Sequence, residues 1–94
     1  MEFLVVALDG TDADALARRM AAREAHLSAF KKLRERGHVV SGGALLDDDG
    51  GMIGSALILD FPDRASVEKC IAEDPYTRGD VWRDVTIRAF RLVR

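Results

Sequence analysis

Strand-like and helix-like segments follow one another along this chain in an order that is compatible with few folds. Apolar runs of strand length occur at residues 3–8, 38–46, 52–61 and 85–93, and helical patterns occur at residues 14–36 and 64–73. The order β-α-β-β-α-β is that of the split β-α-β, or ferredoxin-like, arrangement. We therefore expect an α+β protein with a four-stranded antiparallel sheet and both helices on one of its faces.

The last two strand-like segments carry apolar residues in both phases of the strand alternation. In residues 52–61, Ile53 and Leu57 point to one face, whereas Ala56 and Ile58 point to the other, and residues 85–93 behave similarly. A sheet face in contact with water alternates cleanly between apolar and polar residues. Because the helices cover only one face, the pattern predicts a homodimer in which a second copy covers the other face, as in a dimeric α+β barrel.

Composition narrows the class of protein. The 94 residues are expected to form one domain, residues 1–94, with 48% apolar and 32% charged residues. A net charge of -2 offers no basic stripe for nucleic acid, and no apolar run is long enough to span a membrane. The N-terminus lacks the basic region of a signal peptide, and the single cysteine cannot form an internal disulfide. We expect a cytoplasmic protein.

The first helical segment places polar residues on its packing face. Its apolar stripe on a helical wheel consists of Leu16, Met20, Leu27, Phe30 and Leu33. Arg19, Arg23 and His26 fall in the same arc, although a helix break near Arg23 would change this arrangement. Two interpretations remain open: the arginines extend to solvent around a structural histidine, or the three residues line a functional pocket.

A stiff corner occurs near the end of the chain, in the segment EDPYTRGDV at residues 73–81. Pro75 fixes its own backbone and pushes Asp74 out of the helical region. The corner is either a turn in which Asp74 caps the chain locally, or a device that aims Asp74 and Tyr76 into a site. Trp82 belongs to the core or lines the same cavity as Tyr76.

The remaining polar motifs do not match known ligand sites. The Gly42-Gly43 pair lacks the lysine and following helix of a phosphate-binding loop, and the turn at residues 47–50 lacks the spacing of a calcium loop. His26 and His38 make no metal-ligand spacing with an acid. We expect neither a metal nor a cofactor.

The ordered set of motifs resembles the YCII-related (YciI-like) family over nearly the whole chain. It comprises Arg19, Arg23, His26 and Leu27, then Ser41-Gly42-Gly43, then Asp74-Pro75-Tyr76, with Glu24 at a place where the family often has proline. The resemblance implies a ferredoxin-like fold that dimerises into an α+β barrel. It also implies a pocket with a histidine–aspartate pair, here His26 and Asp74, and a relation to muconolactone-isomerase-like enzymes. At least one branch of the family acts on chlorinated hydroxylated aromatics.

These observations lead to a hypothesis about function. We expect an enzyme without cofactor in which His26 is the general acid and base and Asp74 orients it. The residues expected to bind a small anionic or hydroxylated aromatic substrate are Arg19, Arg23, Ser41, Gly42 and Tyr76. Isomerisation, lactone chemistry or elimination of HX would suit these groups. The alternative is a non-catalytic dimeric module that binds a ligand, and oxygenase chemistry has no support in the sequence.

Overall fold

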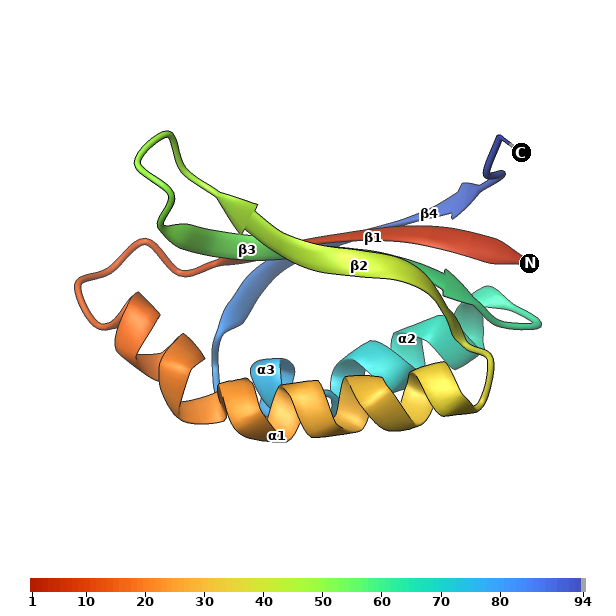
Figure 1. Cartoon of the computed structure of the whole chain (residues 1–94), viewed down its shortest axis with the longest axis horizontal. Helices are drawn as coiled ribbons and strands as arrows, with labels where there is room; N and C mark the ends of the chain where they lie inside the picture. The colour runs from red at the N-terminus through yellow and green to blue at the C-terminus, as the bar shows by residue number, and fades with distance from the viewer. Residues whose placement is uncertain (94) are drawn as a thin grey trace.

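A four-stranded antiparallel sheet with all helices on one face makes up the computed structural model, which describes residues 1–93 (Figure 1). The elements are, in order, β1 (Glu2–Asp9), α1 (Ala15–Glu35), β2 (Val39–Leu46), β3 (Met52–Asp60), α2 (Arg64–Glu73), α3 (Pro75–Arg78) and β4 (Trp82–Phe90). The strand order in the sheet is β2-β3-β1-β4. The predicted β-α-β-β-α-β fold is confirmed, with the four-residue helix α3 added between α2 and β4.

The strand register decides which residues form the core. Val5 of the central strand β1 lies opposite Leu57 of β3 and Ile87 of β4. Directly opposed residues in an antiparallel sheet share a face, so alternate residues of each strand point towards the helices. Val5 and Ala7 are 0% exposed on this face, which places the core between the sheet and the helix layer.

Helix α1 runs without interruption over 21 residues, so the break near Arg23 that the sequence left open does not occur. Glu24, unlike a proline, leaves the backbone hydrogen-bond ladder intact at that point. The helix ends where the sequence predicts, because Gly37 follows it with φ 83°, a conformation that favours glycine. None of the helices in residues 1–93 combines the length and the apolar character that a membrane crossing needs.

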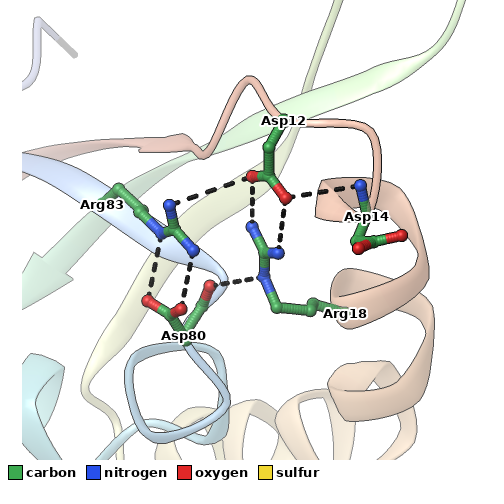
Figure 2. Close-up of polar contacts among 5 residues, drawn as sticks. All are labelled: Asp12, Asp14, Arg18, Asp80 and Arg83. Carbon is green, nitrogen blue, oxygen red and sulfur yellow. Dashed lines mark hydrogen bonds and ion pairs between the residues drawn. The ribbon is translucent and has the colours of Figure 1, made fainter.

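An exposed network of charged residues fastens the start of α1 (Figure 2). Arg18 donates two hydrogen bonds to the Asp12 carboxylate, at 2.8 and 2.7 Å, and a third to the Asp80 carbonyl oxygen at 3.0 Å. Arg83 of β4 pairs with Asp80 at 2.7 Å and lies 3.8 Å from Asp12. The loop after β1 and the turn before β4 are thereby held against the same turn of α1.

The rotation of α1 about its axis differs from the predicted one. Leu16 and Met20 are each 52% exposed, and Leu27 is 45% exposed, although all three were expected in the packing stripe. The buried residues of the helix are Arg19, His26 and Phe30. The polar residues lie inward because both find buried carboxylate partners, so their charges or polar atoms are compensated.

The face of the sheet away from the helices is apolar only in part. Leu4 and Val6 of β1 and Ile58 of β3 are half-buried there. The last strand begins at Trp82, three residues before the predicted start, and it contributes polar residues to this outer face: Asp84, Thr86 and Arg88. Its apolar residues at positions 85, 87 and 89 lie opposite core residues of β1, on the helix side.

Candidate active site

A buried histidine and aspartate meet between α1 and the junction of α2 and α3. His26 Nδ1 lies 2.8 Å from Asp74 Oδ1, and each residue is 6% exposed. The predicted contact between these two side chains is therefore present. Because an ionised carboxylate only accepts hydrogen bonds, Nδ1 is the nitrogen that carries the proton in a pair of neutral imidazole and carboxylate.

The corner at Pro75 positions Asp74 for this contact. Asp74 has φ -64° and ψ 137°, an extended conformation between the end of α2 and the start of α3. Its Oδ1 also accepts a hydrogen bond from the backbone N–H of Tyr76 at 2.8 Å, which caps the short helix. Both interpretations of the corner hold, because Asp74 is a local cap and the partner of His26 at once.

Aromatic rings enclose the imidazole of His26. Tyr76 stacks on it with a centroid distance of 3.9 Å and an angle of 11°, and Trp82 approaches edge-on at 5.5 Å. Burial raises the pKa of the Tyr76 hydroxyl, while Arg19 and Arg23 lower it by a smaller amount. Tyr76 is therefore a neutral phenol at neutral pH.

The second ring nitrogen of His26, Nε2, differs from Nδ1 in its surroundings. Its Nε2 makes no hydrogen bond to any group in residues 1–93, and it is not sealed from solvent. Within the same residues, the buried side-chain nitrogen or oxygen that lacks a partner is Nε of Arg19. The imidazole thus has one nitrogen bonded to Asp74 and one, Nε2, without a partner in this part of the chain.

A buried ion pair that sequence reasoning missed lies beside this pair. Arg19 Nη1 donates to both carboxylate oxygens of Asp9 at 3.0 Å, and Nη2 donates to Ser55 Oγ at 3.0 Å. Trp82 Nε1 donates to the same Ser55 oxygen at 3.2 Å, and the Arg19 guanidinium lies 4.7 Å from the Tyr76 ring centroid. Asp9 balances the charge of Arg19, which leaves Arg19 less suited to bind an anion than predicted.

Strand phase was the signal that could have found these two residues. Asp9 continues the buried phase of Phe3, Val5 and Ala7, and Ser55 continues that of Leu57 and Leu59. Asp9 directly follows the apolar run at residues 3–8, where an acid is also typical of the end of a strand. A polar residue in a buried phase indicates a partner across the core.

A cavity of about 240 Å³ brings most of the predicted site residues together. Of the predicted residues, those that line it are Arg19, Arg23, His26, Gly42 and Tyr76. Gly42 lets β2 approach α1 here, because a Cβ at this position would lie 2.9 Å from Leu57 Cδ2 and 3.0 Å from Phe30 Cζ. Ser41 is not among the lining residues; it lies opposite Ile58, on the outer face of the sheet.

Metal-binding groups do not gather in the part of the chain that the structure describes. No cluster of three or more histidine, cysteine, aspartate or glutamate residues in residues 1–93 has a geometry that could hold a metal ion. Cys70 is half-buried on α2, and burial raises its pKa to about 11, so it is not a reactive thiolate at neutral pH.

The fold and the site together define a class: small ferredoxin-like proteins with an enclosed histidine–aspartate pair beside a small cavity. Residues 1–91 match the YCII-related domain, and the chain belongs to this family. The resemblance drawn from the ordered motifs is thereby confirmed.

Similar proteins agree with this assignment. An uncharacterized protein of Haemophilus influenzae is 31% identical over 84 residues, which cover 83% of this chain and 86% of the relative. Protein YciI of Escherichia coli O6:H1 is 28% identical over 99 aligned residues, with 99% of each chain covered.

Two solved structures share the fold. The 5-chloro-2-hydroxyhydroquinone dehydrochlorinase TftG from Burkholderia phenoliruptrix, in complex with 2,5-dihydroxybenzoquinone, matches with a TM-score of 0.84 and 25% identity, covering 97% of this chain and 94% of TftG. An antibiotic biosynthesis monooxygenase matches over the whole of both chains with a TM-score of 0.55 and 17% identity, which indicates likeness of fold alone.

Proposed function

We propose that this protein is an enzyme that needs no cofactor and transfers a proton on a small hydroxylated aromatic or quinoid substrate. One observation carries the proposal: His26 donates from Nδ1 to the buried Asp74 carboxylate at 2.8 Å, and its Nε2 is left without a partner in residues 1–93 beside a cavity. In the neutral ring Nε2 then carries the lone pair, so it can act as a general base. Asp74 orients the ring and stabilises the imidazolium that forms.

The proposed step balances without an oxidant or a reductant. Nε2 of His26 removes a proton from a hydroxyl group or a ring carbon of the substrate, and the electron pair of the broken bond moves into the conjugated system. In an isomerisation, the imidazolium returns the proton to another atom of the substrate. In an elimination, the imidazolium gives the proton to the ring carbon that carries the halogen, which leaves a ketone with an sp³ C–H carbon. A second hydroxyl group then loses its proton to water, its electron pair moves into the ring, and the halide leaves with the electron pair of its bond to carbon.

The comparison with TftG supports the proposed class of substrate. That protein is a dehydrochlorinase of a chlorinated hydroxyhydroquinone, and its structure contains a dihydroxybenzoquinone. The cavity of about 240 Å³ in this chain lies just below the usual size range of ligand pockets, roughly 300–1,000 Å³, and therefore suits a single-ring molecule.

A non-catalytic ligand-binding module is the second candidate, and a specific contact favours it. Asp74 Oδ1 accepts a hydrogen bond from the Tyr76 backbone as well as from His26, so the pair also stabilises the corner. In this case the cavity would hold a ligand without turnover. The two candidates predict different effects on turnover and stability when His26 is replaced by a residue that lacks Nε2.

The variant His26→Asn separates the two candidates. An asparagine amide can replace Nδ1 as the donor to Asp74, but it has no nitrogen that exchanges a proton near neutral pH. We expect the variant to keep its unfolding midpoint and to lose about 10²–10⁴-fold in turnover. Turnover would be measured by chloride release from the chlorinated hydroxyhydroquinone, and then by deuterium exchange into other hydroxylated aromatics and lactones.

A matched control is available in His38→Asn. His38 also bonds through Nδ1, to the Asp60 carbonyl oxygen at 2.9 Å, and it stacks on Phe61 at 4.2 Å, but it does not line the cavity. This control should keep full turnover. No turnover of these compounds by the wild type, with a stability loss of about 3–5 kcal/mol in His26→Asn, would favour the binding module. Unchanged turnover per folded molecule in His26→Asn would contradict the role of His26 as the general base.

A further inference from the structure

The positive charges around the cavity are not equally compensated. Four cationic or titratable basic side chains line it: Arg19, Arg23, His26 and Arg34. Arg19 is paired with Asp9 and His26 with Asp74. Within residues 1–93, the side chains of Arg23 and Arg34 have neither a hydrogen bond nor an ion pair, and no aspartate or glutamate lines the cavity. This local excess of positive charge contrasts with the net charge of -2 of the whole chain.

The two uncompensated arginines and the compensated groups occupy different depths of the cavity. Arg19 and His26 are 3% and 6% exposed and lie at its floor, near the buried Ser55 and Tyr76. Arg23 and Arg34 are exposed and lie at its mouth.

Both mouth arginines project from the same side of α1. Eleven residues correspond to about three helical turns, roughly 16 Å along the axis, so Arg23 and Arg34 lie on either side of Phe30, which also lines the cavity. The Arg34 guanidinium lies 5.2 Å from the ring centroid of Phe30, which lines the same cavity. This contact holds the charge of Arg34 against the cavity wall instead of leaving it free in solvent.

We propose that the cavity selects ligands that carry a negative charge at the end facing the mouth, and that Arg34 and Arg23 bind this charge. The proposal rests on the function proposed above and narrows its substrate class to hydroxylated aromatics or quinones that are ionised at neutral pH. A hydroxyl group conjugated to a quinone carbonyl behaves as a vinylogous carboxylic acid, and its anion spreads over two oxygens. These two oxygens lie on ring carbons meta to each other, too far apart for a single guanidinium fork, so two arginines suit them, each donating to one oxygen.

Binding, instead of turnover, tests this proposal. Isothermal titration calorimetry at pH 7 would compare 2,5-dihydroxybenzoquinone, which is anionic, with 1,2,4,5-tetrahydroxybenzene under argon, which has the same oxygen pattern but is uncharged. We expect the anion to bind at least about tenfold more tightly to the wild type and to lose this advantage as salt is raised. Arg34→Gln and Arg23→Gln should each lower the affinity for the anion by about tenfold and leave the affinity for the neutral compound unchanged.

Arg36→Gln is the matched control, because Arg36 is an exposed arginine that follows the same helix and does not line the cavity. It should change neither affinity. Equal affinity of the wild type for both compounds, independent of salt, would overturn the charge selection while leaving the proposed function intact. Loss of anion binding in Arg23→Gln alone would overturn the role of Arg34. If neither compound bound, the proposed substrate class would fall, and this inference with it.

Discussion

At the scale of single residues, we expect the stability of the fold to depend strongly on the buried ion pair of Asp9 and Arg19. Both side chains are almost fully buried, at 4% and 3% exposure, and their carboxylate and guanidinium groups meet at 3.0 Å. Asp9→Asn would leave the arginine charge buried without a counter-charge. We expect a loss of about 3–5 kcal/mol in the free energy of unfolding, measured by urea denaturation.

Asp48→Asn provides the control, because Asp48 is an exposed aspartate in the turn between β2 and β3. Substitutions at such surface positions usually change stability by less than about 0.5 kcal/mol. A similarly small effect of Asp9→Asn would mean that the Arg19 charge reaches water or another partner in solution, and that the ion pair does not hold the cavity floor in place.

At the scale of secondary-structure elements, the charged network at the start of α1 predicts that the stability of the fold decreases at acidic pH. Hydrogen bonding to Arg18 holds the pKa of Asp12 well below its usual range, and hydrogen bonding to Arg83 lowers the pKa of Asp80. A carboxylate with a depressed folded-state pKa stabilises the fold above its unfolded pKa of about 4. This contribution is lost as the pH falls from about 4 towards the lower folded-state value.

The variant Arg18→Gln tests the link between this network and the acid dependence. The variant should be less stable than the wild type near pH 7, and the difference should shrink as the pH falls below about 4, in thermal unfolding followed by circular dichroism. Lys31→Gln removes a positive charge from an exposed position of the same helix, and its effect should not follow the titration of Asp12. A constant difference for Arg18→Gln across the pH range would contradict the prediction.

At the scale of the whole molecule, the outer face of the sheet supports the proposed homodimer. Leu4, Val6 and Ile58 form an apolar centre on this face, and the helices all lie on the other side (Figure 1). Stable interfaces bury about 1,200–2,000 Å² in total, and permanent ones are largely apolar. We expect a dimer at micromolar concentration in sedimentation equilibrium and a folded monomer for Val6→Lys, because the lysine would bury a charge between the two sheets.

Leu16→Lys is the corresponding control. Leu16 is 52% exposed on α1, on the helix side of the sheet, so its replacement should leave the dimer intact. A wild-type monomer would contradict the barrel assembly. The polar residues that β4 adds to the outer face make this test necessary, since they weaken the argument that the whole face is apolar.

Short-range patterns in the sequence were enough to predict the order of the elements and much of their extent. The α2 bounds, Arg64–Glu73, agree with the prediction because Pro62 and Asp63 precede the helix and Pro75 prevents its continuation, and all of these effects act over a few residues. The ordered motifs of the sequence likewise point to His26 and Asp74 as a pair. Periodicity and turn residues are local properties, so one chain reveals them without its neighbours.

The environment of the site depended on contacts between distant parts of the chain. The partners of Arg19 come from β1 and β3, and Ser55 is 36 residues away in the sequence, so only the register of the sheet brings them together. The same long-range pairing turned α1 so that Arg19 and His26 face inward while Leu16 faces solvent. A helical wheel ranks residues by hydrophobicity, whereas the folded chain buries a polar residue wherever a partner across the core compensates its desolvation.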